Sequence, residues 1–307
     1  MSPPRACGRE IGGEGIARVT ALAACRFAHF IAAMLSFGAS LFLCACCSEG
    51  LRRNLSQAVW RIVAASSAVA LITAVLWLAA ESASLSGEWS AAYDPSMIGA
   101  VLIGTAYGNV WAFRLVVAAL LVALVFGRRG RWGEAAISSA ALLASLAMVG
   151  HATMHVGVEG VLQRVNHALH LLAAGAWLGG LIPFLMCVSV YPDPKRRADA
   201  VGAMARFSFW GQFNVAAIVV TGAVNIALIS GHPPIPPSTP YRALLDAKIA
   251  LVSVMIALAL FNRFRLAPRL APGAAALVAL RLTSAAEVAL GTVVVALVSV
   301  FAMLDPR

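Results

Sequence analysis

The sequence contains few charged residues, and this scarcity restricts the class of protein. Only 12% of the 307 residues are Asp, Glu, Lys or Arg, while 61% are hydrophobic; soluble domains carry about 25% charged residues. The segment 63–80, VAASSAVALITAVLWLAA, carries no charge at all, and about 20 apolar residues suffice to cross the hydrocarbon core of a bilayer. The composition therefore excludes a soluble domain and a disordered chain, and it predicts an integral membrane protein.

The sequence also lacks the signatures of common enzymes. It contains no Gly-x-Ser-x-Gly motif of a hydrolase and no His-Glu-x-x-His motif of a zinc protease. Its six cysteines lie mostly within apolar runs, so they indicate no disulfide framework. These absences favour a protein that is not an enzyme.

Acidic residues are scarcer than basic ones. There are 13 Asp and Glu residues against 23 Lys and Arg residues, which gives a formal net charge of +10. The basic residues occur in short clusters between apolar runs, as they do on the cytoplasmic side of membrane proteins. The expected partner is therefore the lipid bilayer, and no nucleic acid is expected.

Eight apolar segments predict an all-α integral membrane protein with a single membrane domain over residues 1–307. The predicted spans are 22–47, 58–80, 109–127, 134–151, 163–190, 206–230, 243–263 and 283–304. The links after odd-numbered spans are basic, for example Arg128, Arg129 and Arg131, whereas the links after even-numbered spans are acidic or proline-rich. The positive-inside rule then places the basic links in the cytoplasm and both termini on the periplasmic side.

The two halves of the chain are similar, which predicts two parallel four-helix repeats at about 22–151 and 163–304. The pattern HFIAAxxxFG at 29–38 matches HLLAAxxxLG at 170–179. In transporters, binding sites often lie at the interface between such repeats. Two further pairs add to the match: TxYxxxWxxR at 105–114 with TxYxxxLxxK at 239–248, and Thr73 with Thr221.

Histidine and methionine residues gather on the predicted outer side and form a candidate metal site. His167 and His170 are three residues apart in the fifth span, so they share a helical face. His29 is the duplicate of His170. Imidazole together with thioether sulfur favours copper, and capture should weaken at low pH because a ligand imidazole must be neutral. The predicted metal ligands are His29, His167, His170, His151, His155, Met148 and Met154.

Three other interpretations fit the same histidines. Each could be an ordinary hydrogen-bonding residue at the membrane interface. His29 and His170 could be the axial ligands of a b-type haem in a membrane electron-transfer protein. The protein could also be a docking subunit whose outer loops hold a periplasmic partner.

Two further groups have open roles. The segment Cys44-Ala-Cys46-Cys47, at the inner end of the first span, fits a Cu(I) acceptor, tight packing at a helix end or a palmitoylation site. Glu287 lies within the eighth span near its predicted inner end. Arg263 or Arg281 could neutralise its charge there.

Several short motifs resemble the copper resistance protein D family (CopD, PcoD). They are His170 with Trp177-Leu-Gly-Gly-Leu181, Arg206-Phe-Ser208, Thr221-Gly-Ala-Val-Asn225, Thr239-Pro-Tyr241 leading to Lys248, and Asn262-Arg263. One departure is Tyr241-Arg242, where the family usually has Tyr-Gly-Arg. The resemblance implies a copper-handling protein of the bacterial inner membrane, with a copper ion as the bound metal. It also implies a periplasmic copper-binding partner of the CopC type.

Overall fold

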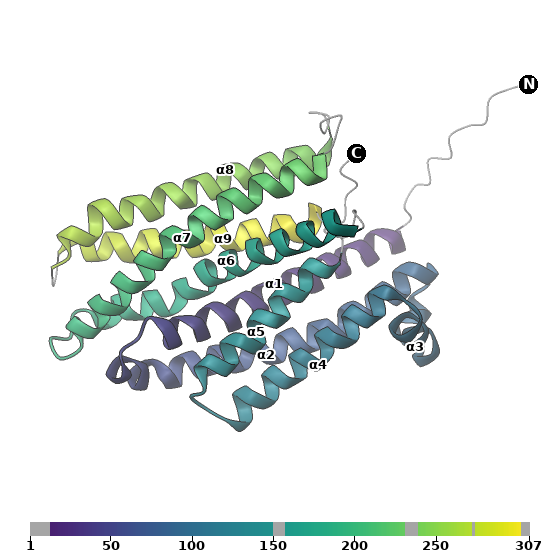
Figure 1. The fold of residues 1–307 in the computed structure, drawn as a ribbon, viewed down its shortest axis with the longest axis horizontal. Helices are drawn as coiled ribbons and strands as arrows, with labels where there is room; N and C mark the ends of the chain where they lie inside the picture. The colour runs from purple at the N-terminus through teal and green to yellow at the C-terminus, as the bar shows by residue number, and fades with distance from the viewer. Residues whose placement is uncertain (1–12, 150–156, 231–238, 272–273, 302–307) are drawn as a thin grey trace, which may run out of the picture.

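The chain folds into an elongated bundle of helices (Figure 1). The computed structural model describes residues 13–149, 157–230, 239–271 and 274–301, and every regular element in these ranges is a helix. The predicted all-α architecture is therefore confirmed. The main helices are α1 (Gly13–Ala45), α2 (Glu49–Ser86), α3 (Pro95–Gly104), α4 (Ala106–Gly127), α5 (Trp132–Ser145), α6 (Gly157–Val190), α7 (Arg197–Ser230), α8 (Pro240–Phe261) and α9 (Ala275–Phe301).

Within the described ranges, seven helices are long and apolar enough to cross a membrane. They coincide with seven of the eight predicted spans. The exception is the predicted span 134–151, where α5 and the turn η2 (Leu146–Met148) form a shorter apolar helix. The sequence prediction did not include α3, which begins where Asp94 accepts a hydrogen bond from the backbone N–H of Ser96 at 2.9 Å.

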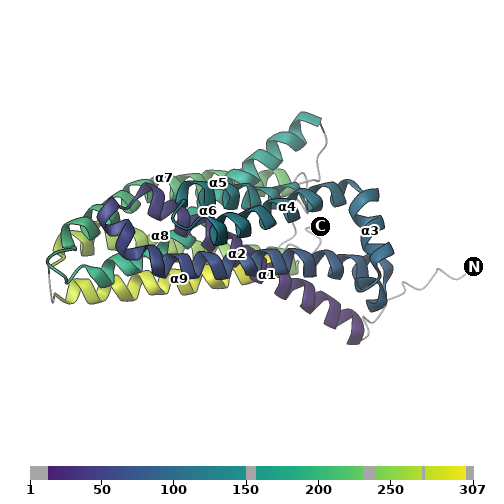
Figure 2. The same ribbon diagram turned by 90° about the horizontal axis from the view of Figure 1, so that it is seen from below.

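Successive long helices run in opposite directions, so the links alternate between the two ends of the bundle. The links α1–α2, α4–α5, α6–α7 and α8–α9 meet at one end, on the left in Figure 1. We call this the basic end, because it holds the predicted basic clusters, for example Arg128, Arg129 and Arg131. The opposite end, where α1 begins and α9 finishes, is the histidine end. Figure 2 shows the same arrangement from below.

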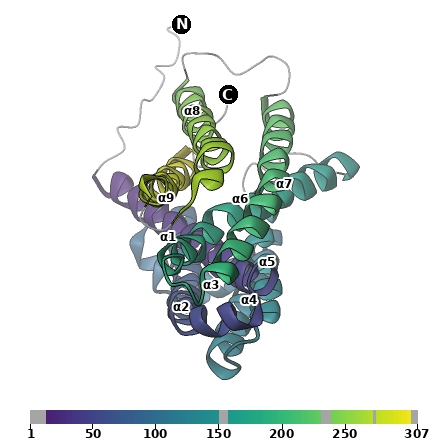
Figure 3. The same ribbon diagram turned by 90° about the vertical axis from the view of Figure 1, so that its left-hand side faces the viewer.

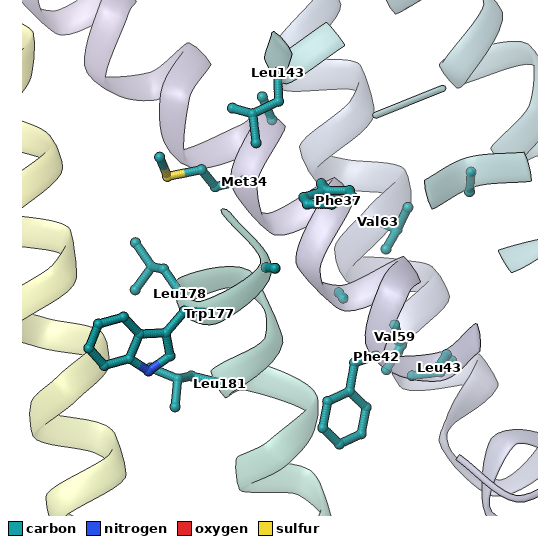
Figure 4. Packing of buried hydrophobic residues seen from close by; sticks show 14 of the residues in the cluster. Met34, Phe37, Phe42, Leu43, Val59, Val63, Leu143, Trp177, Leu178 and Leu181 are labelled. Atoms are coloured by element: carbon teal, nitrogen blue, oxygen red, sulfur yellow. The ribbon is translucent and has the colours of Figure 1, made fainter. Parts of the chain in front are cut away.

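The centre of the bundle is a close crossing of α1 and α6. A Cβ atom added at Gly38 of α1 would lie 2.6 Å from the Cα of Gly179 on α6. A Cβ at Gly175 would lie 3.3 Å from Phe37 and also overlap Leu143 of α5. Figure 4 shows Phe37 and Leu143 beside this crossing. Only glycine allows the two backbones to approach so closely.

The two halves of the bundle are built from similar helix pairs. The most extensive contacts join α1 to α2 and α6 to α7, and α4–α5 is matched by α8–α9. Thr105 caps α4 by accepting from Gly108 N–H at 2.8 Å, and Thr239 caps α8 by accepting from Arg242 N–H at 3.3 Å. These similarities are what a duplication would produce. The boundaries of the repeats stay a prediction.

The halves differ in how their second and third long helices meet. In the first half α2 packs extensively along α4, whereas the contact between α7 and α8 is slight, with Ile226 of α7 packed against Tyr241 and Leu245 of α8. Figure 3 shows α7 and α8 separated at their upper parts. The second half is therefore more open than the first.

We expect Gly179→Ala to lower the free energy of unfolding by about 3 kcal/mol, because its methyl group would overlap the backbone of Met34. Denaturant unfolding of the purified protein in detergent measures this value. Gly211→Ala is the control, since a Cβ there meets no atom within 4 Å. The control should leave the stability unchanged or raise it by about 1 kcal/mol. Equal stabilities of the two variants would contradict a tight crossing.

Candidate metal-binding site

His29 is fully buried between α1 and α2. Its Nδ1 lies 3.0 Å from Thr73 Oγ1 and 3.0 Å from the carbonyl oxygen of Ala70. Thr73 donates its own hydroxyl proton to the carbonyl of Val69 at 2.6 Å, so Nδ1 must be the donor in these contacts. The lone pair of Nε2 then has no hydrogen-bond partner. This tautomer is the one that a metal-binding histidine adopts.

His170 repeats this arrangement between α6 and α7. Its Nδ1 lies 2.9 Å from Thr221 Oγ1, and Thr221 donates to the carbonyl of Ala217. Nδ1 of His170 is therefore again the donor, which leaves its Nε2 as the acceptor. The ring of His170 is partly exposed, unlike that of His29.

His167 lies beside His170, as the spacing of three residues predicts. The two rings are nearly parallel, with centroids 6.4 Å apart and an interplanar angle of 10°. Asn225 of α7 places its side-chain amide nitrogen 3.4 Å from His167 Nδ1. Its amide oxygen accepts from Asn166 at 3.0 Å. The two histidines thus form the centre of a polar cluster on α6 and α7.

In the first half, aromatic rings and a buried cation cover His29, which corresponds to His170. Trp111 of α4 packs against Trp77 of α2 with ring centroids 4.9 Å apart, and its indole N–H donates to the carbonyl of Ala74 at 3.0 Å. The guanidinium of Arg114 lies 4.1 Å from the Trp111 ring and donates to Ser145 Oγ at 3.1 Å. His29 is thereby sealed from solvent.

The second half has smaller or more polar residues at these positions. The repeat alignment pairs Trp77 with Asn225 and Trp111 with Leu245. It pairs Arg114 with Lys248, whose ammonium group is near enough to His170 to act on it electrostatically. Because His167 and His170 are partly exposed whereas His29 is fully buried, the His167–His170 pair is the more accessible of the two histidine sites.

The other predicted ligands are not joined to this pair. Met148 ends the η2 turn with 48% of its surface exposed. His151, Met154 and His155 lie outside the described residues. Across the described part of the chain, no three His, Cys, Asp or Glu side chains lie close enough together to hold a metal ion. The seven-residue ligand set therefore stays a prediction.

Two of the three cysteines at the basic end are packed inside the protein, and the third, Cys44, is exposed. Cys46 and Cys47 form the link between α1 and α2, and both are buried. Burial raises the pKa of Cys46 to about 11 and that of Cys47 to about 12. Arg206 of α7 donates to the carbonyl of Cys46 at 2.7 Å, which ties the link to the second half. At neutral pH these groups are therefore thiols and not thiolates.

Comparison with family models gives two matches that follow each other along the chain. Residues 17–161 match the model described as Copper resistance protein D-like, N-terminal domain. Residues 201–301 match the model described as Copper resistance protein D. No solved structure matches the chain significantly.

Three individual proteins are similar to the chain. Inner membrane protein YebZ of Escherichia coli (strain K12) is 34% identical over 92% of this chain and 97% of its own length. Copper resistance protein D of Pseudomonas syringae pv. tomato is 30% identical over 80% of this chain and 82% of its own. Copper transport protein CutJ of Bacillus subtilis (strain 168) is 27% identical over 58% of this chain and 34% of its own. These matches give the haem alternative no support.

We expect His29→Ala to destabilise the protein by about 2 kcal/mol, because it removes a fully buried, hydrogen-bonded ring. His170→Ala removes the equivalent but partly exposed ring, so its effect on the unfolding free energy should be clearly smaller. Thermal or denaturant unfolding in detergent compares the two variants. A larger loss for His170→Ala would contradict the assignment of His29 as the sealed copy.

We expect a membrane-permeant maleimide to modify Cys44 before Cys46 or Cys47 at pH 7, because Cys44 is exposed. Thiolate is the reactive form, and the raised pKa values keep Cys46 and Cys47 protonated until the pH approaches about 11 to 12. Mass spectrometry of the labelled peptides measures the order. Rapid labelling of Cys46 at pH 7 would contradict this account of the link.

Proposed function

Because the chain belongs to the copper resistance protein D family, we propose that it moves copper ions across the inner membrane of a bacterium. The relatives' names support the location in the inner membrane and the role in copper handling separately. One relative is an inner membrane protein, one confers copper resistance and one is a copper transport protein. Copper is the cargo in this proposal, which includes no enzymatic step.

The observation that carries the proposal is the hydrogen bond from His170 Nδ1 to Thr221 Oγ1 at 2.9 Å. A histidine whose Nδ1–H is held by a neighbouring hydroxyl oxygen presents the lone pair of Nε2 in a fixed direction, as metal ligands do. His167 lies beside it and offers a second imidazole. Two nitrogen ligands on one helix face provide a first binding place for copper.

The remaining predicted ligands complete the path in this proposal. Met148, at the end of η2, and His151, Met154 and His155, which follow it in sequence, would receive copper before the His167–His170 pair. His29 would act as the counterpart of His170 in the first half. Imidazole and thioether groups bind copper strongly but exchange it between sites, so the ion can pass by ligand exchange.

The orientation follows from the basic links. With the basic end in the cytoplasm, the histidine end and both termini face the periplasm. A periplasmic copper-binding protein of the CopC type would then deliver the ion to the histidine end.

We expect His167→Ala combined with His170→Ala to reduce copper accumulation in cells that depend on this protein. The two substitutions remove both imidazoles of the accessible pair while leaving the α1–α6 crossing intact. Cellular copper measured by mass spectrometry, at equal protein level, gives the result. Val165→Ala combined with Leu169→Ala is the matched control, because these neighbouring side chains of α6 are 51% and 53% exposed. Copper accumulation equal to that of the unaltered protein would remove the pair from the transport path.

A further inference from the structure

The bundle contains a buried carboxyl group that the proposed copper path does not use. Glu287 lies near the midpoint of α9 and is 2% exposed. Because α9 begins at Ala275 rather than at residue 283, Glu287 lies about three turns into the helix. Ionisable residues within a membrane bundle are costly, and they commonly mark proton or ion pathways.

Hydrogen bonds hold the carboxyl group of Glu287 in place. Asn262, in the π-helical segment η4 (Asn262–Leu266), donates its amide N–H to Glu287 Oε1 at 2.7 Å. The amide oxygen of Asn262 lies within hydrogen-bond distance of the hydroxyl of Thr283, which also lies 2.8 Å from the carbonyl oxygen of Ala279. The indole N–H of Trp177 on α6 also donates to Glu287. The carboxyl is therefore bound by α6, α9 and the end of α8.

Among the residues that the structure describes, no cation balances this carboxyl group. In the described chain, Glu287 makes no ion pair, and no charged side chain acts on it appreciably. Arg263, which the sequence offered as its partner, donates instead to Ser208 of α7 at 2.8 Å. Arg281 of α9, the other candidate, is exposed.

The charged or titratable groups on the other helices around α9 are occupied elsewhere. On α1, Arg26 lies 5.1 Å from the ring of Trp77, and His29 bonds to α2. On α6, His170 bonds to Thr221, and Lys248 of α8 acts on His170. Arg265 and Arg269 lie at the basic end, exposed. A carboxylate isolated from water and cations is far less favourable than the neutral acid.

We propose that Glu287 is a proton-binding site buried inside the bundle, neutral in this conformation, that exchanges its proton for copper during transport. The exchange of a proton for copper rests on the proposed function. A copper cation that reaches the carboxyl stabilises the carboxylate, and one proton leaves as the ion binds. Trp177 follows His170 by seven residues, which is about two helical turns, so the histidine pair and the carboxyl lie along one side of α6.

Infrared spectroscopy tests the proton site without any transport. The C=O stretch of a protonated carboxylic acid is separate from the bands of carboxylate and amide groups. We expect the purified protein in lipid at pH 7 to show a protonated-acid band that Glu287→Gln removes. Glu81→Gln is the matched control, because Glu81 also bonds to an indole, that of Trp77, but has Arg26 beside it. Glu81→Gln should leave the protonated-acid band unchanged. A spectrum in which Glu287→Gln removes no protonated-acid band would overturn the proposal.

Copper flux tests the exchange. We expect copper uptake by proteoliposomes to alkalinise the lumen in step with copper movement, as a trapped pH dye reports, because each ion that enters is exchanged for a proton that leaves. Glu287→Gln should abolish this proton signal, and Glu287→Asp should retain part of it. Copper flux that continues in Glu287→Gln with an unchanged proton signal would overturn the exchange. If the unaltered protein showed no copper flux, the proposed function would be overturned instead. The infrared result would still decide whether Glu287 binds a proton.

Discussion

The close contact of α1 with α6 at Gly38 and Gly179 determines the rest of the bundle. In lipid, helices gain little from burying apolar side chains, so close backbone packing must supply much of the association energy. Because α1 and α6 meet at matching glycines, each presents the opposite side to its own partner helix. Those partners, α2 and α7, carry Thr73 and Thr221, which orient His29 and His170. A tight crossing at the centre thus fixes the geometry of both histidine sites.

Hydropathy predicted most of this fold because membrane spans are long and almost free of charge. The family was recognisable from short motifs, and the matches confirm it. Helix ends were harder to predict, since a helix continues into charged residues outside the membrane: α2 begins at Glu49 and α7 at Arg197. The short helices α3 and α5 were missed or overextended, because apolar length alone does not show where a chain turns.

The candidate site was predictable only where it depends on spacing along one helix. The intervals in the sequence placed His167 next to His170 and paired His29 with His170. The seal of Trp77, Trp111 and Arg114 around His29 depends on contacts among several helices, which the spacing did not indicate. For the same reason the partner of Glu287 was misjudged, since a π-helical turn at the end of α8 brings Asn262 to it instead of Arg263.

The sealed surroundings of His29 also bear on how rigid each half of the bundle is. Arg114 is 0% exposed and lies over the ring of Trp111, whereas the histidine pair of the second half is partly exposed. Side chains in a densely packed interior interdigitate and leave few voids, so the buried cluster around His29 has little room to rearrange. The first half would therefore act as the rigid wall against which the second half, whose helices α7 and α8 are less buried, can move.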